Sequence, residues 1–148
     1  GHSKMSSLMM IRSEFTRGAL DFKDKHLELG KFYYEEKPDD IKGILESRPK
    51  YTFENGNIYF GQWLEGTLTR HGKGLYIYKS GTINLGWYKN DTSTGKTRYI
   101  WNDGTSLEGY QTNGMISGIV SKIICTGQKY FGQLKDDQKD GFGIYIYQ

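Results

Sequence analysis

The chain has 148 residues, with 20 glycines, 12 tyrosines and 2 prolines, and its mean hydropathy of −0.68 predicts a thin, wet fold. Its 20 basic and 17 acidic residues leave a net charge of +3, and neither end of the chain is polybasic, so bulk charge argues against a nucleic-acid partner. The single cysteine, Cys125, excludes an internal disulfide framework and favours a reducing compartment such as the cytoplasm.

The amino-acid composition of the chain and the structure it predicts change near residue 50. Residues 1–4 are expected to be a cloning remnant, with Met5 as the native start. Residues 5–50 are expected to form an N-terminal helical or irregular capping segment. Residues 51–148 are rich in glycine and aromatic residues, and they predict strands and turns.

The N-terminal segment carries two helix signals. Apolar residues between Ser6 and Leu29 follow a loosely helical spacing, which predicts one or two helices. Asp39 or Asp40 can cap a further short helix over residues 41–46. Pro49 is expected to end that helix, because the residue before a proline is pushed out of the helical region.

Glycines recur at a fixed period in the second part of the chain. One series stands 23 residues apart and consists of Gly72, Gly95, Gly118 and Gly141. Self-similarity at such a period indicates a repeat architecture. Each unit reads as two short strands joined by polar turns, which predicts a β-hairpin. A half-repeat at residues 51–56 therefore precedes four repeats, of which the last is incomplete.

The alternation of side chains along each second strand separates two faces. One face carries an isoleucine column, which is expected to be core: Ile77, Ile100, Ile123 and Ile146. The other face carries a mostly aromatic set: Tyr76, Tyr78, Tyr99, Trp101, Tyr145 and Tyr147. Lys122 and Ile124 interrupt that set, which makes the third repeat the most degenerate copy.

The repeat unit resembles a known family. The first repeat reads Tyr59-x-Gly61-x-Trp63, then His71-Gly72-x-Gly74, and closes on Gly81. This pattern is similar to the MORN repeat (membrane occupation and recognition nexus). The resemblance implies a mainly β fold, in which stacked hairpins form an elongated, single-layer antiparallel sheet with a groove on one side. The short α-helical N-terminal segment would lie beside it.

The resemblance also implies functions. MORN arrays are scaffolding and targeting modules, and they occur beside phosphoinositide kinase domains and in junctional, ciliary and cytoskeletal proteins. The sequence itself contains no catalytic constellation, so the chain is expected to be non-enzymatic, without catalytic residues, metal or cofactor. Its expected place is the cytoplasm, with the membrane, cytoskeleton and cilium open, and homo-oligomers are also compatible with the family.

Two interpretations of the aromatic face carry similar weight. The six rings can simply pack on their neighbours, or they can line a groove for a helix or peptide of a partner protein. Aromatic side chains suit such a groove because they bring a large contact area at low entropic cost.

Two alternative functions remain. A basic strip, which suits a phosphoinositide headgroup or an anionic membrane, can be drawn through Arg70, His71, Lys73, Lys96 and Arg98. Residues 51–148 carry only 10 basic against 8 acidic residues, so such affinity would be modest. Aromatic hairpin repeats can also bind carbohydrate or choline, whose ammonium group stacks on rings.

Overall fold

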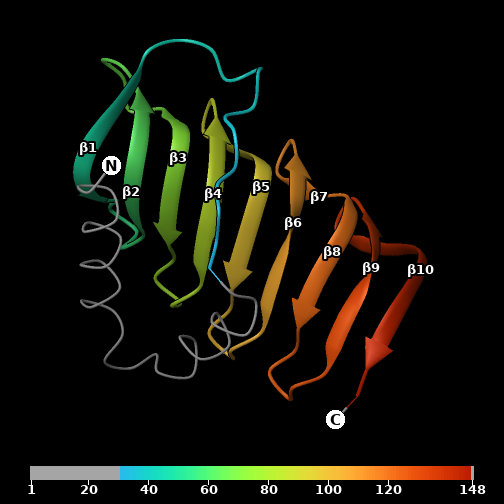
Figure 1. Ribbon diagram of the computed structural model, residues 1–148. Helices are drawn as coiled ribbons and strands as arrows, with labels where there is room; N and C mark the ends of the chain where they lie inside the picture. The colour runs from blue at the N-terminus through green and yellow to red at the C-terminus, as the bar shows by residue number, and fades with distance from the viewer. Residues whose placement is uncertain (1–30, 148) are drawn as a thin grey trace.

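The computed structural model describes residues 31–147, which form one open antiparallel sheet (Figure 1). The sheet order is β1-β2-β3-β4-β5-β6-β8-β9-β10, and β7 pairs with β6 beside this path. The strands are β1 (Leu45–Thr52), β2 (Ile58–Leu64), β3 (Arg70–Ile77), β4 (Ile83–Lys89), β5 (Thr92–Ile100), β6 (Ser106–Thr112), β7 (Met115–Ile116), β8 (Gly118–Ile123), β9 (Lys129–Lys135) and β10 (Gln138–Ile146). The expected succession of hairpins is confirmed.

The helix predicted over residues 41–46 is wrong. The first strand begins at Leu45, which lies opposite Leu64 of β2, and Pro49 lies inside this strand rather than after a helix. The register shifts between Arg48 and Tyr51, and a proline is tolerated at such an irregularity on an edge strand. Residues 31–147 contain no helix, and therefore none that is long and apolar enough to cross a membrane. The helices predicted between residues 6 and 29 lie outside the described residues.

Residues 31–41, here called the strap, lie along one face of the sheet and run beside β4 and β5 (Figure 1). Phe32 packs against Leu75 and Leu85, and the Tyr34 ring meets the Trp87 ring edge-on at 6.1 Å. The Trp87 indole N–H donates to the backbone oxygen of Tyr34 at 2.7 Å. The segment expected to cap the array thus supplies the hydrophobic cover for one face, called the strap face below.

The isoleucine column lies on the strap face. Ile77, Ile100 and Ile123 are buried, as the alternation predicts. Ile146 is 47% exposed, so the prediction is wrong for the fourth member of the column. Its strand, β10, is the last in the sheet order and pairs with β9 only.

The 23-residue glycine series occupies backbone positions that few other residues adopt. Gly72, Gly95, Gly118 and Gly141 have φ values between +67° and +106°. The β2–β3 register shifts between Gly61 and Trp63, next to the first of these positions, which is typical of a glycine bulge. The period seen in the sequence is therefore the period of the bulges.

Candidate functional site

The face opposite the strap, called the groove face here, carries one continuous row of side chains. Strand pairing places the members of this row directly opposite one another from β2 to β10. In sheet order they are Tyr59, Tyr76, Asn84, Tyr99, Leu107, Lys122, Tyr130 and Tyr145. Five of the eight are tyrosines; Asn84 interrupts the row at one position, and the two neighbours Leu107 and Lys122 form its widest gap.

A parallel row of small residues lies under the rings. A side-chain carbon at Gly74 would stand 2.5 Å from the Tyr59 ring, and one at Gly143 would stand 2.5 Å from the Tyr130 ring. Glycine at these two positions therefore lets each ring lie flat across the neighbouring strand. The third repeat has Val120 at the equivalent position, where the first-strand residue is not a ring.

The first repeat fills its part of the groove face completely. Trp63 and Tyr59 are 0% exposed, and their rings meet edge-on at 4.9 Å. Tyr76 and Tyr88 belong to the same buried cluster. Burial raises the pKa of the Tyr59 and Tyr88 hydroxyls well above the ordinary value, so both phenols stay neutral in the folded protein.

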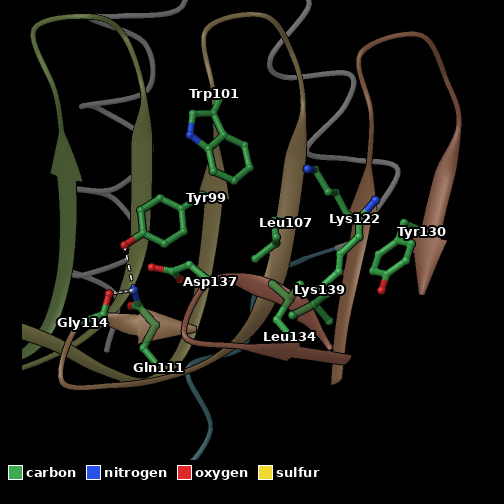
Figure 2. A pocket seen from close by; sticks show the side chains of 11 residues that line it. Tyr99, Trp101, Leu107, Gln111, Gly114, Lys122, Tyr130, Leu134, Asp137 and Lys139 are labelled. Carbon is green, nitrogen blue, oxygen red and sulfur yellow. Dashed lines mark hydrogen bonds between the residues drawn. The ribbon is translucent and has the colours of Figure 1, made fainter. Parts of the chain in front are cut away.

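The third repeat leaves a pocket of about 360 Å³ at the same level of the groove face (Figure 2). Four of its own side chains line the pocket, and none of them is aromatic: Leu107, Gln111, Val120 and Lys122. The turn residue Gly114 of the same repeat also lines the pocket, and the neighbouring repeats supply Tyr99, Trp101, Tyr130, Leu134, Asp137 and Lys139. The pocket therefore stands where rings fill the first repeat.

Aromatic and amide groups form one side of this pocket. Tyr99 and Trp101 stack at 5.7 Å with an angle of 16° between their planes. The Gln111 amide nitrogen donates to the Tyr99 hydroxyl at 2.9 Å and to the Gly114 carbonyl at 3.2 Å (Figure 2). The Gln111 Oε1 atom is buried and has no hydrogen-bond partner among residues 31–147. Burial also raises the pKa of the Tyr99 hydroxyl.

The charged residues of the pocket lie on two sides. Figure 2 shows Asp137 beside Tyr99, the Lys139 side chain toward Tyr130, and the Lys122 side chain pointing away from Tyr130 toward Trp101. The Asp137 carboxylate accepts the backbone N–H of Ile116 at 2.7 Å, which fixes it at the end of a hairpin turn. The Lys139 ammonium stands 4.9 Å from the Tyr130 ring centre, a cation–π contact.

A comparison with protein-family models identifies the repeat unit. The MORN repeat model matches residues 59–83 and 130–148. These two segments are MORN repeats. The matched segments hold the first repeat and the fourth, and the pocket is centred on the third repeat between them and is closed on one side by residues of the fourth. No curated protein matches the chain.

The six aromatic residues predicted for the groove fall into three pairs on the MORN array. Tyr76 and Tyr78 approach to 4.8 Å, Tyr99 stacks on Trp101, and Tyr145 stacks on Tyr147 at 6.0 Å. Tyr76 is buried within the packed cluster of the first repeat, whereas Tyr78, Tyr145 and Tyr147 are exposed. The pairs stand at the C-terminal ends of β3, β5 and β10, and the end of β8, the corresponding strand of the third repeat, carries no such pair.

The residues of the predicted basic strip separate onto different parts of the MORN array. Arg70 pairs with Asp91 at 3.1 Å, and its guanidinium covers the Tyr76 and Tyr88 rings. His71 is buried, and its Nδ1 accepts the N–H of Asn90. The proton of this neutral imidazole therefore stands on Nε2, which donates to a backbone carbonyl.

The other three members of the strip lie on the strap face. Lys73 lies over the rings of Tyr34 and Trp87. Lys96 stands 4.0 Å from Glu35 and lies over the ring of Phe32. Arg98 is 1% exposed and pairs with Glu108 at 2.6 Å. These cations stabilise the attachment of the strap and the pairing of neighbouring strands.

Sequence reasoning missed most of the pocket. Gln111, Tyr130, Asp137 and Lys139 were not among the predicted groove residues, although Tyr99 and Trp101 were. The available signal was the loss of rings from the third repeat, which is visible in the sequence as Gln111 and Lys122 at ring positions. A loss of rings in one hairpin leaves a space only where the adjacent hairpins keep theirs.

Proposed function

We propose that this MORN array is a non-catalytic scaffold or targeting module that binds a helix or peptide of a partner protein along the groove face. The ring row and its gap carry the proposal, because they combine exposed rings with a pocket on one continuous surface. Aromatic residues are enriched at protein interfaces. A row that crosses many strands suits an elongated ligand with a few anchor side chains.

Binding to a phosphoinositide or an anionic membrane is less well supported. Lys96 and Arg98 are engaged by carboxylates and lie against Phe32 of the strap. A lipid headgroup would have to displace these contacts, and breaking a buried ion pair is costly. A protein partner on the opposite face requires no such rearrangement.

A peptide-display selection on the purified chain tests the proposal. Random peptides displayed on phage are selected, and the enriched sequences are synthesised and titrated by fluorescence anisotropy. We expect Trp101→Ala to weaken their binding by about tenfold or more, as truncation of a central aromatic anchor usually does. Phe142→Ala is the matched control, because Phe142 is an exposed ring on the strap face of β10. Equal losses of peptide affinity in both variants would contradict binding along the groove face.

Two further titrations separate the alternatives. Sedimentation with phosphatidylcholine vesicles, with and without phosphoinositides, detects membrane binding. Choline and soluble oligosaccharides test the carbohydrate alternative by calorimetry. Vesicle or sugar binding together with a failure to enrich any peptide would replace the protein-partner proposal.

A further inference from the structure

We propose that the pocket of the third repeat is the anchor site for an acidic peptide segment, whose tryptophan enters the pocket while a neighbouring carboxylate pairs with Lys122 and Lys139. The inference rests on the proposed function and specifies the chemistry of the partner. A peptide ring would complete the row at the one repeat where the chain supplies none.

The shape of the pocket favours a ring as the occupant. Its apolar floor comes from Leu107 and Val120, and the stacked pair of Tyr99 and Trp101 forms a flat wall. In the first repeat, rings occupy the equivalent volume and pack edge-on against one another. A volume of about 360 Å³ is at the lower end of the range for ligand pockets, which suits an anchor side chain rather than a whole helix.

The buried amide oxygen favours tryptophan over a purely apolar anchor. Gln111 is 4% exposed and lines the pocket. Both hydrogen bonds that its amide nitrogen makes are satisfied, whereas Oε1 lacks a donor among the described residues. A buried acceptor without a donor is unfavourable, and an indole N–H supplies the missing bond. Leucine and phenylalanine cannot supply it.

The charges select an acidic neighbour. Lys122 makes no hydrogen bond or ion pair within residues 31–147, and Lys139 contacts only the faces of Tyr130 and Tyr145. Both ammonium groups are therefore available to a carboxylate that lies between the Lys122 and Lys139 side chains, across the pocket from Asp137. Asp137 on the other side disfavours a phosphate, which carries more negative charge than a carboxylate. The Asp137 carboxylate can also accept a hydrogen bond from a backbone N–H of the peptide.

Synthetic peptides test the inference directly. Twelve-residue peptides with a central Trp, Phe or Leu, each flanked by Glu, Gln or Lys, are titrated against the full chain by fluorescence anisotropy. We expect the Trp–Glu peptides to bind about fivefold to tenfold more tightly than the Trp–Gln peptides, the range expected for two partly exposed ion pairs. This preference should shrink as salt is raised.

Two double variants locate the source of that preference. Lys122→Gln with Lys139→Gln is expected to remove the preference for Glu over Gln while Trp peptides still bind. Lys129→Gln with Lys135→Gln is the matched control, because it removes two charges from strap-face positions of β9. A Glu preference that survives in the first variant, or is lost in the control, overturns the inference. Tighter binding of the Lys peptides would do the same.

The variant Lys122→Tyr distinguishes failure of the inference from failure of the proposed function. A tyrosine at this position restores the ring row and fills the pocket, and it is expected to abolish binding of the Trp peptides. If peptides from the display selection bind this variant and the parent chain equally, the groove function stands and the pocket is not the anchor. If the selection yields no peptide at all, the proposed function itself fails.

Discussion

The first and third repeats share a backbone plan and differ in what lies on the groove face. In the first, Trp63 and Tyr59 are completely buried in an aromatic cluster. In the third, Gln111 and Leu107 stand at the same two positions, and a pocket opens beside them. Repetition therefore supplies the frame of the array, and departure from the repeat creates a place where a ligand can enter.

The difference is coordinated across each hairpin. Where the first strand carries a tyrosine, as at Tyr59 and Tyr130, the residue of the second strand that lies under its ring is glycine, Gly74 or Gly143. Where the first strand carries Leu107, that position is Val120. The smaller side chain on the first strand is thus partly offset by the larger side chain of Val120 on the second. The space that is still unfilled is the pocket beside Gln111 and Lys122.

The largest expected effect comes from making the first repeat resemble the third at its most buried ring. Trp63→Gln removes a fully buried indole, and we expect it to lower the free energy of unfolding by about 3–5 kcal/mol. Urea unfolding measures this change. Gln111→Ala is the comparison, with an expected loss of about 1 kcal/mol, since it removes two hydrogen bonds but no ring. Similar losses would mean that the two repeats are packed alike.

The second prediction exchanges the residue under the ring. Gly74→Val places side-chain carbons within the Tyr59 ring, and we expect it to cost about 3 kcal/mol by overpacking. Tyr59→Leu in the same chain recreates the combination of Leu107 and Val120. The double variant should be more stable than the sum of the single losses predicts, by about 1–3 kcal/mol. Additive losses in urea unfolding would disprove the coupling.

The third prediction uses the buried hydroxyls of the ring-rich repeats. Tyr88 has a folded pKa raised by burial, and its hydroxyl donates to Asn84 at 2.7 Å. Its contribution to stability is complete below the unfolded pKa near 10 and is lost as the pH rises above that value, by about 1.4 kcal/mol per pH unit. Tyr88→Phe should therefore flatten the alkaline fall in stability. An unchanged slope in urea titrations between pH 9 and about 11 would contradict this.

The sequence predicted the two faces well because strand alternation and a fixed period leave little freedom. Ile77 and Tyr76 fall on opposite faces by parity alone, and the bulge glycines keep that parity in register. The helix over residues 41–46 failed because Asp40 is a local capping signal, whereas pairing of Leu45 with Leu64 is a long-range contact. A local sequence pattern does not reveal that a segment will pair with a strand far along the chain.

The pocket was harder to predict for a related reason. Its lining joins Tyr99 of the second repeat, Gln111 of the third and Asp137 of the fourth, so no single repeat contains the site. Asp137 lies in the turn between β9 and β10, and the hydrogen bond that its carboxylate accepts from Ile116 also places that carboxylate at the pocket. A turn residue that reaches back to the preceding repeat cannot be recognised from the spacing within one unit.

The smallest effect is the most informative about why the third repeat differs. Lys122→Tyr sets a ring directly opposite Tyr130, the neighbour that Tyr145 meets at 4.8 Å from the other side. We expect a gain of about 1 kcal/mol in urea unfolding, as for a new aromatic pair, and Lys135→Tyr at the exposed end of β9 should change stability by less than about 0.5 kcal/mol. A more stable chain that no longer binds Trp peptides would indicate that stability is sacrificed here for binding. A less stable one would instead mean that the pocket is too shallow for a ring, and that its vacancy follows from the backbone rather than from the missing side chain.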